Sequence, residues 1–495
     1  MKCLQMKEAR KSSRDDVKYC HTMNQKYYVT TPIYYVNDIP HIGHTCTTLA
    51  ADALARFAKQ QGKEVFFLTG TDEHGAKVVE AASKEGVPPQ EFCDQVSQRF
   101  RDIWPRLNIQ NDYFIRTTNP KHKEIFSRLI NQLYDQGEIY KKKYGGWYCV
   151  GCEKYITEKD LVDGKCPDHN RPPIWQEEEN YFFKLTKYVP ILIEAIQNPH
   201  SPYYYQIEPE AKRNEVLSRL KDDVIDISIS RANVPWGIPI PWDKEQTTYV
   251  WIEALCNYYS ALEINNRLDF WAKDMEIDHL VGKEILWFHA AVWPAMLIAL
   301  NLPLPKRIFA HNFYMVDGQK MSKSLGNVIA PEEMIKRYGV DGTRYLIYTS
   351  FPHTNDSDVG WSRFTEKYNS DLANGLGNLV SRVARLCEKA QLEHKPEVQF
   401  ECPNEFTHAV NNLKFDQALA YIWEKITQVD KTFNEQEPWK QSGEALKKTL
   451  RTSVTSLHEI AYLLTSFLPQ TAEQIKEQFT GEIQARTPLF PKIDA

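Results

Sequence analysis

Two short stretches far apart in the chain carry residue types suited to binding phosphate. In the first, His41 and His44 stand three residues apart with Gly43 between them, where apolar residues begin to recur at helical spacing. A helix N-terminus offers unpaired N–H groups and a positive dipole end, and glycine permits a ligand to approach the backbone closely. Two imidazoles there indicate a phosphate site, although such pairs also occur on solvated helix faces or as metal ligands.

The second stretch, Lys-Met-Ser-Lys-Ser at 320–324, places two lysines and two hydroxyls just after the Asp317-Gly318 turn. Lysine clusters are usually solvated surface, yet these lysines lie among turn residues rather than along an amphipathic helix. This second stretch strengthens the prediction of a phosphate site.

The elements around the histidines predict an α/β fold. The aromatic and β-branched run 27–31 indicates a buried strand, and the apolar run 64–70 indicates a strand buried on both faces, as in a parallel sheet. Helical segments follow near 89–104 and 121–136, which gives the alternating β-α pattern of a Rossmann-type domain. Asp72 and the residues after it then fall at the carboxyl end of a strand, where open α/β sheets bind ligands. The dinucleotide fingerprint GxGxxG is absent, so a mononucleotide is the better prediction.

The second half of the chain returns to this pattern and then becomes helical. We predict a strand at 277–282, an apolar helix at 286–294, and a strand from Ile308 to Val316 that delivers the lysine loop. Beyond Trp361 the strand signals disappear, and leucines spaced by four and three predict a helix with one buried face. The remainder reads as a helical bundle to about Glu477.

Four potential metal donors lie between the two halves of the α/β pattern. Cys149 and Cys152 form one tight pair, and Cys166 and His169 form another after thirteen intervening residues. This spacing predicts a tetrahedral Zn²⁺, and packed cysteines without a metal are the less favoured alternative. Because all four positions are filled, the site is expected to be structural, and to stabilise an insertion of about 100 residues that has little core of its own.

Composition sets outer limits. A chain of 495 residues suggests roughly three domains. The formal net charge of −5 gives no sign of a nucleic-acid partner, although binding depends on local basic patches rather than on the sum. Ten cysteines without a signal peptide or disulfide spacing favour a reducing compartment, and no apolar run reaches the roughly 20 residues of a membrane span. We therefore expect a cytoplasmic protein without a membrane segment, whose residues 1–22 form a disordered extension.

Together, the stretches at 41–44 and 320–324 resemble the two signatures of class I aminoacyl-tRNA synthetases. The neighbouring segments 31–37, 70–75, 249–254 and 282–285 are similar to those of the methionyl-tRNA synthetase family, in its bacterial type with a single zinc knuckle insertion. The resemblance extends from about Met23 to the end of the chain. It implies ATP- and Mg²⁺-dependent activation of L-methionine and its transfer to the 3′ end of tRNA(Met), for translation initiation and elongation.

The resemblance also implies roles for individual residues. The residues implied in catalysis are His41, His44, Lys320 and Lys323, which Gly43 and Ser322 join in binding ATP. The residues implied in binding methionine are Ile33, Tyr35, Asp72, Trp251, Tyr258 and His289. Such a set is chemically reasonable, because aromatic rings suit a polarizable sulfur and a carboxylate pairs with an ammonium group. A lone histidine on an apolar helix, such as His289, is otherwise more often a core residue.

The first predicted helix of the bundle carries Asn374, Asn378 and Arg382 in a row at spacings of four. From spacing alone, a solvated face is the favoured interpretation. The resemblance instead assigns Asn378, Arg382 and Trp439 to reading the anticodon, where amide and guanidinium groups would contact base edges and the indole would stack.

The resemblance implies a domain order that places the zinc insertion inside the catalytic domain. The ranges are a first catalytic half at 23–137, the insertion at 138–245, a second catalytic half at 246–308, a linker with the lysine loop at 309–370, and a helical anticodon-binding domain at 371–495. No further β-rich module follows, so we predict a monomer.

Two other functions remain possible interpretations of the motifs. A smaller adenylyl or nucleotidyl transferase would explain the histidines but would leave the insertion and the helical bundle without a role. A non-catalytic tRNA-binding or zinc-ribbon protein would be expected to lack one of the four catalytic positions, and all four are filled.

Overall fold

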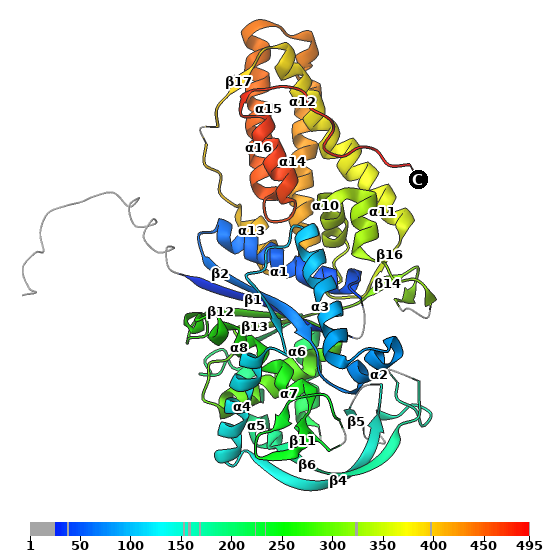
Figure 1. Ribbon diagram of the computed structural model, residues 1–495. Coiled ribbons are helices and arrows are strands. Elements are labelled where there is room, and N and C mark those ends of the chain that lie inside the picture. The colour runs from blue at the N-terminus through cyan, green and yellow to red at the C-terminus, as the bar shows by residue number, and fades with distance from the viewer. Residues whose placement is uncertain are drawn as a thin grey trace, which may run out of the picture.

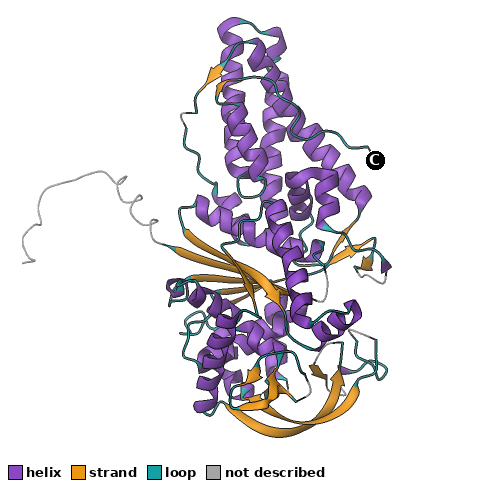
Figure 2. Cartoon of the chain, in the orientation of Figure 1, coloured by secondary structure: helices purple, strands orange, loops and turns teal. Residues whose placement is uncertain are grey.

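The computed structural model describes residues 25–36, 39–151, 154–156, 160–167, 170–222, 224–232, 234–321, 325–396 and 398–494. The predictions for residues 1–22 and for Cys152, His169, Ser322 and Lys323 lie outside these ranges. Figures 1 and 2 show an elongated molecule with a parallel sheet at its middle, a helical bundle at one end, and a long curved antiparallel sheet at the other.

The central sheet has six strands, and every neighbouring pair is parallel, in the order β3-β2-β1-β12-β13-β7. These strands are β3 (Tyr113–Arg116), β2 (Glu64–Asp72), β1 (Lys26–Tyr35), β12 (Glu276–Gly282), β13 (Arg307–His311) and β7 (Gln206–Glu208). The predicted α/β class with a parallel sheet is confirmed, as is the strand at 277–282.

Alternate residues of each strand point to opposite faces of the sheet, and both faces are buried. In β2, Val65 and Phe67 belong to one hydrophobic cluster, while Phe66 and Leu68 belong to the other. The first cluster includes residues of α1 (Ile42–Gln60), α2 (Ala76–Glu85), α3 (Pro89–Arg106) and α10 (Pro331–Thr349). The second includes residues of α4 (Pro120–Asp135), α5 (Leu185–Gln197), α6 (Glu210–Lys221), α7 (Val250–Leu255), α8 (Asn257–Ile264) and α9 (Trp293–Ala299).

The strand order reverses direction beside β1. The chain passes from β1 through α1 to β2 on one side, whereas β12 and β13 extend the sheet on the other side. Connections that leave two neighbouring parallel strands in opposite directions leave a crevice at their carboxyl ends. The histidine pair, which follows β1, lies at that crevice.

The stretch that we predicted as an insertion is partly continuous with the central sheet. It forms a four-stranded antiparallel sheet of β4 (Ile139–Cys149), β5 (Lys154–Ile156), β6 (Ile174–Phe183) and β8 (Ile227–Ser228). It also forms a smaller sheet of β9 (Ser230–Arg231), β10 (Pro239–Ile240) and β11 (Asp243–Thr248). However, β7 from the same stretch pairs with β13 and adds the edge strand of the central sheet.

The single strand predicted from Ile308 to Val316 is wrong. β13 ends at His311, and β14 (Tyr314–Val316) belongs to a different sheet with β15 (Gln319–Lys320) and β16 (Ser357–Val359). The break occurs because the intervening amides bond elsewhere: Asn312 N–H donates to the Pro352 carbonyl, and Phe313 N–H donates to Asp356 Oδ1. The chain therefore leaves the central sheet before it reaches the lysine loop.

The helical end begins with α11 (Trp361–Lys367), a π-helical segment (Tyr368–Gly377) and α12 (Asn378–Lys389), which follow one another without a break. The leucine stripe is confirmed, since Leu372, Leu376 and Leu379 are buried. The bundle continues with α13 (Asn404–Asn411), α14 (Phe415–Glu435), α15 (Gly443–Leu464) and α16 (Pro469–Gln478). The short strand β17 (Glu393–His394), before these helices, pairs antiparallel with β18 (Gly481–Glu482), after them. Among the described helices, none has the length and apolar character needed to cross a membrane.

Candidate active site

The two histidines cap the first turn of α1 with their own side chains. His41 is the N-cap residue, and its Nδ1 accepts a hydrogen bond from Gly43 N–H at 3.0 Å. His44 Nδ1 in turn accepts from His41 N–H at 3.3 Å, and the two rings stack with centroids 3.8 Å apart. This reciprocal arrangement satisfies two backbone donors that a helix N-terminus would otherwise leave unpaired.

The cap fixes the tautomer and the charge of His44. Because its Nδ1 accepts a hydrogen bond, the proton of the neutral ring must reside on Nε2. Burial, assisted by the neighbouring His41, holds the pKa of His44 well below its ordinary value, so the ring is neutral near pH 7. His44 thus offers an N–H donor rather than a positive charge.

The lysine loop approaches the histidines from the other side of the crevice. The methyl carbon of Met321 lies 3.8 Å from the point that a β-carbon on Gly43 would occupy. Nearby, Ile42 N–H donates to the Ile329 carbonyl at 3.0 Å, which holds the first turn of α1 against the segment after the loop. Lys320 is exposed at the end of β15, with its ammonium 5.5 Å from the Phe313 ring centre. The two stretches, about 280 residues apart in sequence, therefore meet.

The side chains predicted to bind methionine lie around the carboxyl ends of β1 and β2. Ile33, Tyr35 and Trp251 are half-buried against the same hydrophobic cluster. Tyr35 is paired in register with Asp72, which is the last residue of β2, and its hydroxyl donates to the His74 carbonyl at 2.8 Å. Trp251 stacks on Phe288, with ring centroids 4.5 Å apart. We did not single out Phe288 from the sequence.

Tyr258 and His289 are connected directly. His289 Nδ1–H donates to the Ile285 carbonyl at 2.9 Å, so its Nε2 accepts from the Tyr258 hydroxyl at 2.7 Å. Burial lowers the pKa of His289 to about 4, which keeps the ring neutral and preserves this direction. The pair presents a fixed, uncharged wall, as an apolar side chain would require.

A buried carboxylate that sequence reasoning overlooked connects three parts of the site. Glu253 lies on α7, two residues after Trp251, and accepts hydrogen bonds from His74 Nδ1–H at 2.6 Å and from His122 Nε2–H at 3.1 Å. All three side chains are buried. Glu253 thereby joins α7 to the carboxyl end of β2 and to α4. Its signal in the sequence is a lone acid within an otherwise apolar helix.

The charge on Glu253 depends on the two imidazoles. Burial by itself raises the pKa of this carboxyl, but His74 and His122 more than offset that effect, and the net pKa is lowered. The group is therefore ionised at neutral pH and positions Trp251 relative to Asp72 through charged hydrogen bonds.

Two of the four predicted metal donors, Cys149 and Cys166, lie within the described residues. Cys149 and Cys166 are 3 % and 1 % exposed and belong to one small cluster with Ile156. Cys149 ends β4 opposite Lys154 across a turn, and Cys166 closes a second turn through Asn170 N–H, which donates to its carbonyl. The donor set thus fits a tetrahedral ion.

The residues predicted to read the anticodon lie close together at the end of the bundle. Asn378 and Arg382 lie one turn apart on α12, and the Arg382 guanidinium donates to Asp430 Oδ1 at 2.7 Å. Both Arg382 and Trp439 lie near the Phe433 ring, with Trp439 in edge contact at 6.5 Å. Half of the Trp439 surface is exposed. The arrangement leaves an aromatic face beside an arginine and an amide.

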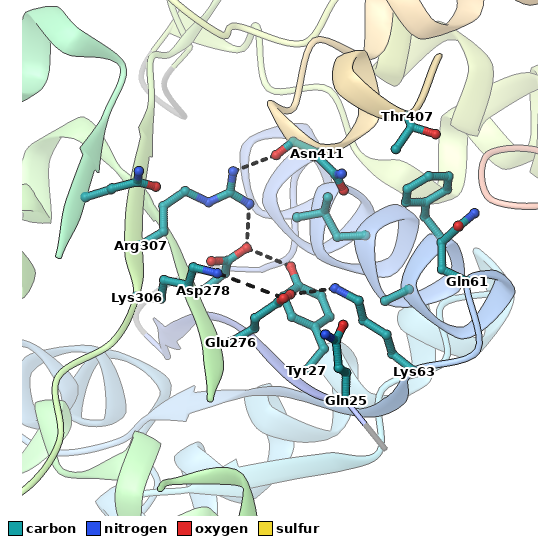
Figure 3. Close-up of a pocket in the computed structure, with 14 residues that line it drawn as sticks. Gln25, Tyr27, Gln61, Lys63, Glu276, Asp278, Lys306, Arg307, Thr407 and Asn411 are labelled. Atoms are coloured by element: carbon teal, nitrogen blue, oxygen red, sulfur yellow. Dashed lines mark hydrogen bonds and ion pairs between the residues drawn. The ribbon is translucent and has the colours of Figure 1, made fainter. Parts of the chain in front are cut away.

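The opposite edge of the central sheet holds a cavity of about 420 Å³ between the sheet and α13 (Figure 3). Its charged groups pair with one another: Lys63 contacts Glu276 at 2.6 Å, and Arg307 contacts Asp278. The Tyr27 hydroxyl also donates to Asp278, at 2.8 Å. Because these cations are neutralised by neighbouring acids, this cavity does not have the character of a triphosphate site.

Comparisons with known proteins agree with this geometry. The family model described as tRNA synthetases class I (M) matches residues 27–172 and 169–384. The chain is 43 % identical to the methionine–tRNA ligase of Clostridium acetobutylicum, over 93 % of this chain and 74 % of that protein. It is 40 % identical to the corresponding ligase of Thermotoga maritima, over 95 % and 81 %. The structure of Mycobacterium tuberculosis methionyl-tRNA synthetase with methionyl-adenylate superimposes with a TM-score of 0.84 at 32 % identity, covering 94 % of this chain and 100 % of that one.

The Glu253 network gives a test of how the site is held together. We expect Glu253→Gln to lower the free energy of unfolding by about 3 kcal/mol at pH 7, because it leaves two buried imidazoles without a charged partner. A carboxyl with a lowered pKa stabilises the fold above its ordinary pKa of 4.5, and this stabilisation is lost as the pH falls through the lower value of the folded state. Urea unfolding at pH 7 and pH 4 would measure the difference.

Glu263→Gln is the matched control, since Glu263 pairs with Arg128 at the surface and should change stability by less than about 0.5 kcal/mol. If Glu253→Gln lowers the free energy of unfolding by the same amount at pH 7 and at pH 4, the charged role of Glu253 is contradicted.

Proposed function

The chain belongs to the class I tRNA synthetases of the methionine type, and on this premise we propose that the paired histidines and the lysine loop act on a single triphosphate. The protein activates L-methionine with ATP and transfers it to tRNA, the reaction of a methionine–tRNA ligase. The observation that carries the proposed site is the approach of the Met321 methyl carbon to within 3.8 Å of the point that a β-carbon on Gly43 would occupy, which brings two motifs together at the crevice of the sheet.

In the first step, the methionine carboxylate attacks the α-phosphate of ATP in line, and the bond to the β-phosphate breaks. The products are methionyl-adenylate and pyrophosphate. Such phosphoryl chemistry depends on positioning and on stabilisation of developing charge rather than on a protein nucleophile. We propose that His41 and His44 donate hydrogen bonds to the phosphates, that Gly43 gives the nucleotide access to the backbone, and that Ser322 also contacts ATP.

The histidines and the lysines would contribute in different ways. A neutral His44 supplies a directed N–H donor, whereas Lys320 and Lys323 supply positive charge to the leaving pyrophosphate. Mg²⁺ accompanies ATP and neutralises part of its charge. The side chains differ accordingly: His41 and His44 are half-buried and held by the cap, while Lys320 is exposed at the edge of a small sheet.

We propose that methionine lies between Tyr35, Trp251 and the Tyr258–His289 pair, with Ile33 against its side chain. Its ammonium group would pair with the Asp72 carboxylate, since a carboxylate is the natural partner of an amine. The aromatic faces suit a thioether, and the neutral His289 adds no charge to an apolar pocket.

In the second step, a ribose hydroxyl at the 3′ end of tRNA(Met), first the 2′-OH, attacks the carbonyl of methionyl-adenylate and displaces AMP. We propose that Asn378, Arg382 and Trp439 recognise the anticodon at the far end of the bundle. Their side chains can hydrogen-bond base edges and stack on an unpaired base. The same enzyme would supply methionyl-tRNA for both initiation and elongation.

We further propose that residues 138–245 act as the connective insertion within the catalytic domain, between the halves at 23–137 and 246–308. One structural Zn²⁺, held by Cys149, Cys152, Cys166 and His169, would fix its knuckle, and a closed site of this kind supplies folding energy rather than catalysis. The helical domain at 371–495 would follow the linker at 309–370. We propose a monomer that works in the cytoplasm, where translation takes place.

The role of His44 can be tested by methionine-dependent exchange of labelled pyrophosphate into ATP. We expect His44→Ala to lower kcat by about 10²–10³, because it removes one donor to the transition state. The KM for methionine should change little, since His44 does not lie in the methionine pocket. His408→Ala, an exposed histidine on α13, should leave both values unchanged.

Wild-type enzyme without methionine-dependent exchange would exclude a synthetase and favour a nucleotidyl transferase or a non-catalytic protein. A His44→Ala variant with normal kcat would remove the proposed role of the capped histidine.

The zinc site can be tested by metal analysis. Wild-type protein should contain about one zinc per chain, and Cys149→Ser should lose most of it and melt at a lower temperature, because a thiolate ligand is removed. Cys402→Ser, at a half-buried cysteine elsewhere, should retain the metal. Wild-type protein purified without chelators and free of zinc would refute the site.

The anticodon site can be tested with Trp439→Ala. A stacked base contributes about 1–3 kcal/mol, so the KM for tRNA should rise roughly 5- to 150-fold. Pyrophosphate exchange, which needs no tRNA, should be unaffected and serves as the internal control. An unchanged KM for tRNA would show that this indole does not contact the anticodon.

A further inference from the structure

The helix that carries the histidines also reaches the helical bundle. α1 contains 19 residues and is therefore about 28 Å long. Its N-terminus forms the phosphate site. At its last turn, the Gln60 side chain donates to the Tyr462 carbonyl at 2.8 Å and accepts from the Ser466 hydroxyl at 3.1 Å, and both partners belong to the bundle. α1 thus extends from the catalytic crevice to the anticodon-binding part as one continuous helix.

Halfway along α1, a fully buried ion pair connects the same parts. Arg344 on α10 donates through Nη2 to Asp52 of α1 at 2.6 Å, and both side chains are 0 % exposed. Its Nε–H donates to the Phe467 carbonyl, at 2.7 Å, in the turn between α15 and α16. Its Nη1 donates to the Leu107 carbonyl at 3.1 Å, after α3. A single guanidinium therefore joins α1, α10, the α3–β3 connection and the bundle.

Neighbouring side chains reinforce this junction. The Tyr348 hydroxyl donates to the Leu49 carbonyl of α1 at 2.8 Å, while its ring packs edge-on against Phe467 and Phe415 of the bundle. Asp341 accepts from Thr471 N–H at 2.6 Å, in the first turn of α16. Successive turns of α10 thus contact the bundle on one side and α1 on the other.

Stability alone does not account for this arrangement. Removing an arginine and a carboxylate from water costs several kcal/mol per ion, and apolar side chains of similar volume often stabilise a core equally well. An apolar cluster, however, tolerates small sliding of one helix over another. A planar guanidinium with donors directed at three fixed acceptors allows one geometry only. What the pair adds is a defined placement of α1 relative to the bundle.

We propose that Arg344, assisted by Gln60, is a positioning residue that fixes the spacing between the phosphate site and the anticodon-binding end of the protein. This inference rests on the proposed recognition of tRNA at both ends. A tRNA bound by its anticodon presents its 3′ ribose to the adenylate only if that spacing is correct. An error of about 1 Å in such a placement can lower a rate by roughly 10²-fold. Methionine activation involves only the crevice and does not depend on the spacing.

Three reactions of the full-length enzyme separate this role from general support of the fold. They are methionine-dependent pyrophosphate exchange, charging of intact tRNA(Met), and charging of an acceptor-stem fragment that lacks the anticodon arm. For Arg344→Lys, which keeps the charge but cannot reach all three acceptors, we expect kcat/KM for intact tRNA to fall roughly 10-fold. Exchange and fragment charging should stay within about twofold of wild type.

Gln60→Ala is a second variant at a half-buried position, and it tests the same inference should Arg344→Lys fold poorly. We expect kcat/KM to fall roughly threefold for intact tRNA and to stay unchanged for the fragment. Arg56→Lys is the matched control: Arg56 donates to Asp52 at 2.8 Å and to the Asn108 carbonyl, both within the catalytic part. Any fall in kcat/KM caused by Arg56→Lys should be equal for intact tRNA and for the fragment.

The inference is supported if the ratio of intact-tRNA to fragment charging falls in Arg344→Lys and Gln60→Ala but not in Arg56→Lys. It is overturned if kcat/KM falls equally for intact tRNA and for the fragment in Arg344→Lys and Gln60→Ala, since these residues would then only support α1. A wild-type enzyme that charges the fragment as well as intact tRNA would overturn the proposed anticodon recognition, and this inference with it.

Discussion

The reversal of strand order beside β1 is the constraint on which the rest of the site depends. β2 lies on one side of β1 and β12 lies on the other, so the chain connections run away from β1 in opposite directions. No crossover therefore covers the carboxyl ends of these strands, and a crevice remains there. α1 begins there, and the side chains of His41 and His44 cap its first turn. The segment after β13 leaves the central sheet for β14 and β15, and it brings Met321 of the lysine loop near Gly43. Sheet topology thereby brings together two motifs that are distant in sequence.

The histidine cap resolves a conflict at this crevice. A helix start attracts phosphate through unpaired N–H groups, but these groups are costly when they are buried without a partner. By accepting backbone protons through Nδ1, His41 and His44 satisfy two of them. His44 then presents a proton on its other nitrogen, so the donor is moved outward by the width of a ring. Burial keeps that ring neutral, and the positive charge is supplied by lysine.

The sequence predicted those parts of the fold and site that depend on local pattern. The strand at 64–70 has an unbroken apolar run, the leucine stripe has helical spacing, and the two signature motifs are continuous in the chain. The roles of the zinc ligands and of the methionine pocket remain predictions. The strand from Ile308 to Val316 was predicted wrongly, since nothing in its composition shows that Asn312 and Phe313 bond to Pro352 and Asp356.

Long-range polar contacts could not be predicted from spacing. Glu253 lies 131 residues from His122, and Asp52 lies 292 residues from Arg344. Each is a charged residue in an apolar helix, which signals a buried partner without identifying it. Such pairs form only when the tertiary fold excludes water around them, so the local sequence does not encode the choice of partner.

The mutual neutralisation of charge at the amino edge of the sheet has a consequence for selectivity. Lys63 and Arg307 lie in a cavity large enough for a nucleotide fragment, yet each already contacts a carboxylate of the protein. An incoming polyanion would have to displace Glu276 or Asp278 and would meet their repulsion. Polyanions such as ATP are therefore disfavoured in this cavity, and the pairing of its charges directs triphosphate binding to the crevice at the opposite edge of the sheet.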